Sequence, residues 1–266
     1  MNYHSVMFNL REYFFPCGCG GCGTILKSPI DTFYGLCEKC RTFFETTLAE
    51  EKRCVFCGKP LISETNTCLL CRKRGIAETG SYSEVLVKVR TLFPYKSKFK
   101  TILGNYKFKK YLGIGNYLVF CLQTALDTFY PELASNEEIA WVPVPPRPGK
   151  IKKQGWDQID YLSGLLSKDY RRIHGKITEN NSNNAISNSI QVSRCLKRLA
   201  SRSQKELNRE QRVTNLKGRI LCIKKPPKNA ILFDDVFTTG TTLNACASAL
   251  LKSGAAKVYG LCLFYD

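Results

Sequence analysis

The most regular hydrophobic pattern lies near the C-terminus, where an apolar run from Ala230 to Phe233 precedes two aspartates. An uninterrupted apolar run is typical of a strand that is buried on both faces of a parallel sheet. After a short polar loop, apolar residues recur at helical spacing, namely Leu243, Cys246, Ala247, Leu250 and Leu251. Gly254 stands where such a helix would end. The pattern therefore predicts a strand, a loop and a helix in succession.

Other periodic segments predict further strands and helices. Alternating valines favour a strand over Glu84–Arg90, and a short apolar run that ends in prolines favours another over Ile139–Val144. Tyr111–Tyr130 contains too many polar residues for a membrane span and is typical of a buried amphipathic helix. A further helix is expected to begin near Gly155, with one apolar face formed by Trp156, Ile159, Leu162, Leu165 and Leu166.

Two polar stretches in the second half indicate a loop and a short helix. Thr178–Gln191 is rich in Asn and Ser, which favours a flexible surface loop. Ser203 and Glu206 have the spacing of a capping box, so a helix is expected from there to about Arg212.

Nine of the 14 cysteines lie between Cys17 and Cys71, and eight of these form four Cys-x-x-Cys pairs. Two such turns close one tetrahedral zinc site, so eight thiolates suffice for two sites. Sequential pairing predicts one site from Cys19, Cys22, Cys37 and Cys40 and a second from Cys54, Cys57, Cys68 and Cys71. Cys17 is a ninth thiol that could replace Cys19. Isolated buried cysteines are the alternative, but the regular repetition favours zinc.

The zinc sites are expected to be structural. Both histidines, His4 and His174, lie outside the cysteine-rich segment, so neither completes an open catalytic site there. We expect a cytoplasmic protein, because the N-terminus does not resemble a signal peptide and the chain has no long apolar run. Thiols stay reduced in that compartment, which favours metal binding over disulfides.

The net charge of +18 is concentrated in one third of the chain, since residues 141–230 hold 20 basic and 6 acidic side chains. Such an excess suits a polyanion, a phosphorylated small ligand or solvent. A second basic segment, residues 88–110, holds eight basic side chains and no acid. The aromatics interleaved with it are Phe93, Tyr95, Phe99, Tyr106, Phe108 and Tyr111. This combination is found in grooves for single-stranded nucleic acid, but a basic helix with its aromatics in the core is the favoured alternative.

The loop after the C-terminal strand has the chemistry of an anion site. Asp234 and Asp235 stand at the strand end, where we expect them to lie outside the core. The loop that follows consists of Thr238, Thr239, Gly240, Thr241 and Thr242. A strand, a small-residue loop and a helix N-terminus direct free backbone N–H groups at a phosphate. No Gly-Lys-Ser/Thr follows, so this is not a Walker loop.

These residues resemble the phosphoribosyl pyrophosphate motif of type I phosphoribosyltransferases. The resemblance implies an α/β fold with a parallel sheet flanked by helices. It also implies that Asp234 and Asp235 hold the ribose hydroxyls. The 5′-phosphate would then lie in the loop of Thr238, Thr239, Gly240, Thr241 and Thr242.

Further segments resemble the ComF family, which joins an N-terminal double zinc ribbon to a phosphoribosyltransferase domain. They are Tyr106-Lys107-Phe108, Pro143-Val144-Pro145, Gln154-Gly155-Trp156-Asp157-Gln158 and the spaced run Leu199, Gln204, Leu207, Arg212, Asn215 and Gly218. The resemblance implies a zinc-ribbon module over residues 1–78 and a phosphoribosyltransferase-like domain over residues 79–266. Gln154 departs from the family, which usually has arginine there, and Lys152 and Lys153 could substitute for it.

The family resemblance implies transfer of a phosphoribosyl group, a reaction of the glycosyltransferase class, with magnesium and basic residues stabilising the pyrophosphate that leaves. Candidates for binding pyrophosphate are Lys150, Lys152, Lys153 and Arg212, and no catalytic base is identifiable. One alternative is a non-catalytic accessory of DNA uptake that contacts single-stranded DNA or a partner protein. Another is a structural zinc-ribbon adaptor. Because Lys107 is remote from the phosphate loop in sequence, we expect the basic segment to lie away from that loop.

Overall fold

The computed structural model describes residues 17–49, 52–73, 85–129, 139–168, 191–200, 216 and 218–266. Within these residues, the largest sheet has five strands in the order β1-β7-β6-β2-β3. All of its neighbouring strands are parallel. The strands are β1 (Val89–Pro94), β2 (Ile139–Pro143), β3 (Gln191–Val192), β6 (Asn229–Phe237) and β7 (Lys257–Tyr265). The predicted α/β fold is confirmed.

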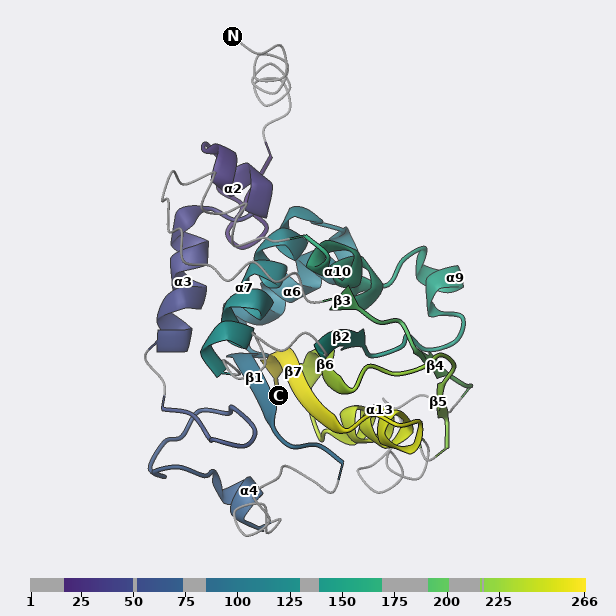
Figure 1. Ribbon diagram of the computed structural model, residues 1–266. Helices are drawn as coiled ribbons and strands as arrows, with labels where there is room; N and C mark the ends of the chain where they lie inside the picture. Colours follow the sequence, from purple (N-terminus) through teal and green to yellow (C-terminus); the bar gives the residue numbers. More distant parts are fainter. Residues whose placement is uncertain are drawn as a thin grey trace.

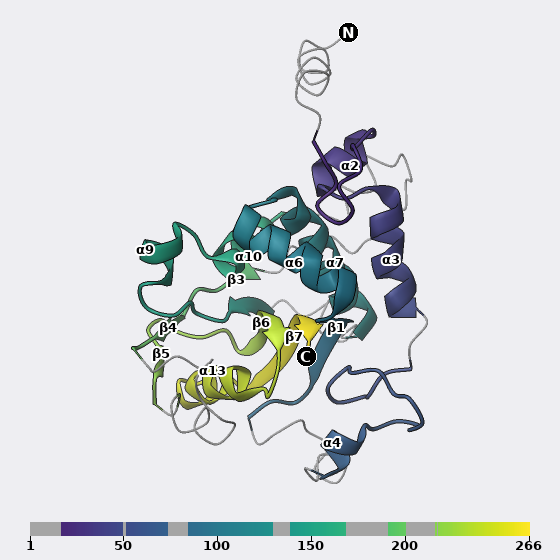
Figure 2. The same ribbon diagram turned by 180° about the vertical axis from the view of Figure 1, so that it is seen from behind.

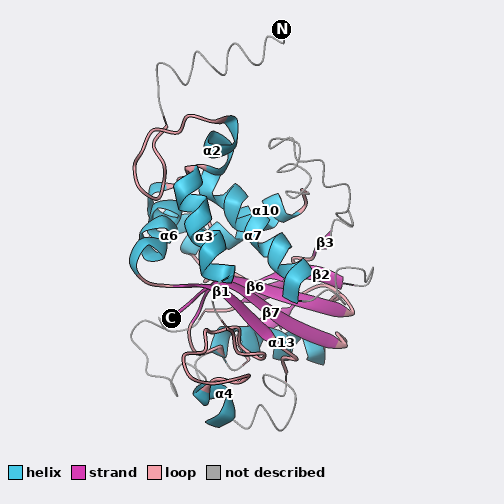
Figure 3. Cartoon of the chain, turned by 90° about the vertical axis from the view of Figure 1, so that its left-hand side faces the viewer, coloured by secondary structure: helices cyan, strands magenta, loops and turns pink. Residues whose placement is uncertain are grey.

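Helices cover both faces of this sheet (Figure 3). One face carries α6 (Ser97–Lys109), α7 (Gly113–Phe129) and α10 (Gln158–Leu166), and the other carries α13 (Thr241–Lys252). Each layer has its own apolar core. Leu118, Leu162 and Phe264 are buried in the first, and Leu243, Leu250 and Cys262 are buried in the second. The central strands are buried on both sides, which explains why their sequences read as apolar runs.

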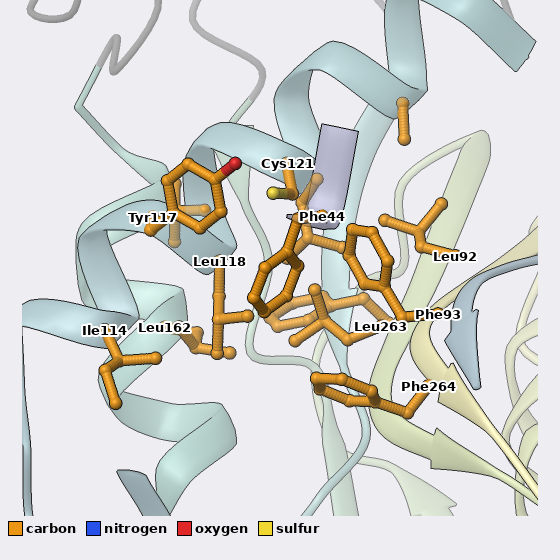
Figure 4. Close-up of a cluster of buried hydrophobic side chains, with 14 of the residues drawn as sticks. Phe44, Leu92, Phe93, Ile114, Tyr117, Leu118, Cys121, Leu162, Leu263 and Phe264 are labelled. Carbon is orange, nitrogen blue, oxygen red and sulfur yellow. The ribbon is translucent and has the colours of Figure 1, made fainter. Parts of the chain in front are cut away.

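The N-terminal segment packs directly on the first of these layers. It contains α2 (Pro29–Tyr34) and α3 (Glu38–Ala49), while α4 (Leu69–Lys73) lies on the other side of the sheet (Figures 1 and 3). Phe44 of α3 is fully buried, and its ring centroid lies 4.7 Å from that of Phe93 in β1. Figure 4 shows this ring among side chains of α7, β1 and β7. The predicted boundary between residues 78 and 79 lies outside the described residues.

A small antiparallel two-stranded sheet and one short helix complete the described chain. Strands β4 (Leu196–Arg198) and β5 (Ile220–Cys222) pair with each other, and their buried residues Leu196 and Ile220 belong to the core around α13. The short helix α9 (Lys150–Gln154) precedes α10. No helix among the described residues combines the length and hydrophobicity needed to cross a membrane.

Two elements begin at least three residues later than the sequence predicts. The strand expected over Glu84–Arg90 begins at Val89 and continues to Pro94, while Glu84 lies outside the described residues. Proline is tolerated because β1 is an edge strand. The helix expected from Gly155 begins at Gln158, because Gly155 ends α9 with a left-handed φ of 76°. The loop predicted up to Gln191 and the helix predicted from Ser203 lie almost wholly outside the described residues.

Candidate functional site

The eight paired cysteines form two clusters, with the sequential pairing that the spacing predicts. Their members are Cys19, Cys22, Cys37 and Cys40 in the first and Cys54, Cys57, Cys68 and Cys71 in the second, and the sulfur atoms within each lie within 4.8 Å of one another. The Sγ atoms of Cys19 and Cys40 are 3.5 Å apart, and those of Cys22 and Cys37 are 3.6 Å apart. A tetrahedron with Zn–S bonds of about 2.3 Å has edges of about 3.8 Å. Both clusters are therefore compatible with structural zinc ions.

The alternative between Cys17 and Cys19 is resolved by the turn that carries them. Cys19 is buried inside the first cluster, whereas Cys17 is exposed and does not belong to it. Glycine follows the first pair of each cluster at Gly23 and Gly58, with φ of 79° and 67°. Those left-handed values are easy only for glycine, and they let the chain turn back after each Cys-x-x-Cys.

The two cysteine clusters are hydrogen-bonded to two consecutive elements of the chain, β1 and α6. The second cluster is joined to β1, where the Val89 N–H donates to the Phe56 carbonyl at 2.8 Å and the Thr91 hydroxyl donates to the Cys57 carbonyl at 3.0 Å. The first is joined to α6, where the Asn105 amide donates to the Gly20 carbonyl at 2.8 Å. Both cysteine turns thus offer backbone carbonyls to the segment 89–109.

The two acids lie deeper than the sequence suggests. Strand β6 continues through both of them to Phe237, and Asp235 is only 7% exposed, while Asp234 is partly exposed. The expectation that both lie outside the core is wrong for Asp235. The Asp235 N–H donates to Asp234 Oδ1 at 2.8 Å, which fixes the relative orientation of the pair.

Asp235 is held by two side chains from distant parts of the chain. Lys107 Nζ lies 2.7 Å from Asp235 Oδ2, and the Gln158 amide donates to the same oxygen. The expectation that Lys107 lies away from the phosphate loop is therefore wrong, because α6 packs so that its C-terminal turn reaches the end of β6. Neither residue was identified as a site residue from sequence, although both belong to segments that resemble the ComF family.

The surroundings give the two carboxyl groups different acidities. Burial alone would raise the pKa of Asp235, but the charge and hydrogen bond of Lys107, the Gln158 amide and the charge of Lys150 lower it. Burial raises the pKa of Asp234 to about 7, and the neighbouring charge of Asp235 adds to this effect. One carboxylate is thus firmly ionised, and the other changes charge near neutral pH.

The proposed phosphate loop has the geometry expected from its sequence. Residues 238–240 connect β6 to α13, and Gly240 stands at the N-cap of α13 with a left-handed φ of 77°. The hydroxyls of Thr239 and Thr241 are hydrogen-bonded to each other at 2.8 Å, while Thr238 is exposed and Thr242 is half-buried. The first amides of a helix have no intrahelical acceptor, so those at the start of α13 can donate to an anion. The Thr241 N–H makes a long contact of 3.5 Å with the Thr239 hydroxyl, which an anion would replace.

The four pyrophosphate candidates differ in their surroundings. Lys150 contacts the carboxylate of Asp157 and the side-chain oxygen of Gln158, and Asp157 also caps α10. Lys152 and Lys153 are exposed on α9, and Arg212 lies outside the described residues.

One further cation near the acids was not identified from the sequence. Arg198 in β4 is buried, and its pKa is lowered by burial and by the neighbouring charge of Arg147, whereas Asp234 opposes this shift.

The basic and aromatic segment divides into a buried part and an exposed part. Phe93, Phe99 and Tyr106 are buried in the core, as expected if the aromatics pack inside. At the end of α6, however, Phe108 is 76% exposed, and Tyr111 is also exposed. Lys109 and Lys110 lie between these two rings in sequence and are exposed as well.

No protein-family model matches the chain. A curated relative, competence protein ComFC of Streptococcus pneumoniae, is 26% identical over 174 residues, which is 65% of this chain and 66% of that protein. The similarity therefore spans a little under two thirds of each. The two four-cysteine clusters, the parallel sheet with its helices, and this similarity together support the resemblance to the ComF family.

Proposed function

We propose that this protein is a phosphoribosyltransferase that binds phosphoribosyl pyrophosphate with magnesium and transfers the phosphoribosyl group to an acceptor. The observation that carries the proposal is the placement of Asp234 and Asp235 beside the threonine loop and the N-terminus of α13, at the carboxyl end of a central parallel strand. Open α/β sheets bind ligands at that edge. Two acids and a helix N-terminus offer acceptors for sugar hydroxyls next to donors for a phosphate.

Each part of the ligand has a partner in this arrangement. Asp234 and Asp235 would accept hydrogen bonds from the ribose hydroxyls. Residues Thr238, Thr239, Gly240, Thr241 and Thr242 would bind the 5′-phosphate. Lys150, Lys152, Lys153 and Arg212 are the candidates for the pyrophosphate, which magnesium would help to neutralise as it leaves.

The test is calorimetric titration with phosphoribosyl pyrophosphate and magnesium, comparing the wild type with Asp235→Asn. Loss of a charged acceptor is worth about 1.5–3 kcal/mol, so we expect affinity to fall about tenfold to over a hundredfold. Asp160→Asn is the matched control, because Asp160 is exposed and pairs with Arg194. Equal affinity of wild type and Asp235→Asn would contradict the ribose assignment.

A separate experiment identifies the acceptor. The wild-type protein is incubated with phosphoribosyl pyrophosphate, magnesium and one base at a time, and the base that causes release of pyrophosphate is the acceptor.

A second candidate function is a role in DNA uptake through contact with single-stranded DNA or a partner protein. It is favoured by the exposed rings of Phe108 and Tyr111 beside Lys109 and Lys110, and by the name of the competence protein that the chain resembles. Exposed aromatics next to lysines can stack on bases while the lysines neutralise phosphates.

This second function predicts oligonucleotide binding with a logarithmic salt slope of roughly −0.7 per phosphate neutralised. Replacing Lys109 and Lys110 with alanine should flatten the slope. The control replaces Lys98 and Lys100 of α6 with alanine, which removes the same amount of charge from the same basic segment. These two lysines lie over the rings of Phe43 and Tyr95 instead. Equal changes of the salt slope in the two double variants would show that oligonucleotide binding depends only on net charge. No binding at low salt would contradict it.

A further inference from the structure

Three consecutive residues of α6 make contacts in three different directions. Asn105 donates to the Gly20 carbonyl in the first cysteine turn, and the Tyr106 hydroxyl donates to the Gln158 carbonyl at 2.9 Å. Lys107 pairs with Asp235. Successive residues of a helix point about 100° apart, so one helical turn can reach three neighbours at once. Figure 2 shows α6 between α2 above it and the ends of β6 and β7 below it.

The first cysteine turn is packed tightly against α6, through Ile102, and against the start of α7, through Ile114. A Cβ at Gly21 would lie 3.3 Å from the Ile102 side chain and 2.8 Å from Cys40 Sγ, and a Cβ at Gly20 would lie 2.6 Å from the Ile114 side chain. The Gly20 N–H also donates to the Gly35 carbonyl at 2.9 Å. The turn therefore has little freedom to move relative to α6 while its cluster is intact.

Both donors to the Asp235 carboxylate depend on the same turn of α6. Lys107 belongs to it, and Gln158 is placed by the bond from Tyr106 to its backbone carbonyl. The Tyr106 ring also packs edge to face on Trp156, with centroids 5.4 Å apart. A shift of this turn would thus move both donors away from Asp235.

We propose that the C-terminal turn of α6 couples the first cysteine cluster to the acid pair, with Asn105 as a positioning residue that acts through Lys107. The consequence for ligand affinity rests on the proposed function of the acid pair. The geometric part does not, because it concerns only how the cysteine turn, α6 and Asp235 are held together.

The chain offers a matched pair of variants for the test. Asn105→Ala removes the bond from α6 to Gly20, and Asn116→Ala removes a similar bond of 2.7 Å from α7 to the Phe33 carbonyl. Both bonds join an asparagine amide to the N-terminal segment, but only Asn105 lies in the turn that reaches Asp235. We expect Asn105→Ala to weaken binding of phosphoribosyl pyrophosphate with magnesium about threefold to tenfold, and Asn116→Ala to leave it unchanged.

A double-mutant cycle of Asn105 and Lys107 distinguishes coupling between these two residues from a general loss of rigidity in the protein. Asn105→Ala should cause a smaller loss of affinity in a Lys107→Met background than in the wild type, because only the Gln158 donor then remains to be displaced. Additive losses, equal losses for Asn105→Ala and Asn116→Ala, or wild-type affinity of Asn105→Ala would each overturn the proposal.

The fluorescence emission of Trp156 reports the position of the α6 turn without any ligand, because this ring packs on Tyr106. Trp156 is one of two tryptophans, so its contribution is the difference between each protein and its Trp156→Phe version. That contribution should change in Asn105→Ala and not in Asn116→Ala. If the wild type binds no phosphoribosyl pyrophosphate, the proposed function fails and this comparison alone decides the coupling. An unchanged Trp156 signal in Asn105→Ala would then overturn it.

Discussion

Asp234 and Asp235 are chemically identical neighbours that the fold places in different electrostatic surroundings. Asp235 faces Lys107 and Gln158, whereas the pKa of Asp234 is raised to about 7 by burial and by the charge of Asp235. Adjacent residues on a strand point to opposite faces, which is why two acids in a row meet different partners. The face of the strand to which each side chain points therefore decides which of the two acids is ionised.

The raised pKa of Asp234 predicts a specific pH dependence of stability. An ordinary Asp has a pKa of about 3.9, so between about pH 4 and pH 7 the unfolded chain ionises this group while the folded protein keeps it protonated. The contribution of Asp234 to the free energy of unfolding is therefore fully present below about pH 4 and is lost as the pH rises to about 7. Asp234→Asn should remove this loss, so denaturant midpoints should favour the variant more at pH 7 than at pH 4. An equal difference at both values would contradict the raised pKa.

At the scale of the element, the loop between β6 and α13 depends on one backbone conformation. Gly240 has a φ of 77°, and a side chain there would cost about 1–2 kcal/mol. Gly240→Ala should lower stability by about that amount and also weaken ligand binding, because the loop amides would turn away from the phosphate. Gly218→Ala is the control, since Gly218 has a similar φ, 70°, and open space around a new Cβ. Thermal unfolding and calorimetry should show equal stability losses but an affinity loss only for Gly240→Ala. Unchanged affinity would argue against this loop as the phosphate site.

The sequence predicted β6, α13 and the cysteine clusters because each depends on a local pattern. An apolar run, a helical repeat and four Cys-x-x-Cys pairs can be read without knowing what packs on them. The contact of Lys107 with Asp235 could not be predicted in this way, since it joins residues 128 positions apart through the packing of α6 on the sheet. The start of α10 was missed for a local reason, because Asp157 caps the helix after the glycine at 155 has already ended α9.

At the scale of the whole molecule, the cysteine clusters stabilise the fold from two sides of the sheet. The second is hydrogen-bonded to the edge strand β1, and the first shares a core with the sheet through Phe44. An exposed edge strand can pair with another chain, and the bonds that Val89 and Thr91 donate to the carbonyls of Phe56 and Cys57 cover part of β1. The N-terminal segment is therefore part of the architecture that supports the acid pair, in addition to any role of its own.

This arrangement predicts about two equivalents of zinc per chain in protein purified without added metal, measured by elemental analysis. Cys17→Ser should keep both equivalents, because Cys17 is exposed and outside the first cluster, whereas Cys19→Ser should lower the content to about one. Cys19→Ser should also lower the midpoint of thermal unfolding, since loss of the first ion releases the segment that places Phe44 in the core. Zinc loss in Cys17→Ser would instead assign Cys17 as the ligand. A metal-free wild type that unfolds at the same temperature as the metal-loaded protein would show that the clusters do not need zinc to hold this fold together.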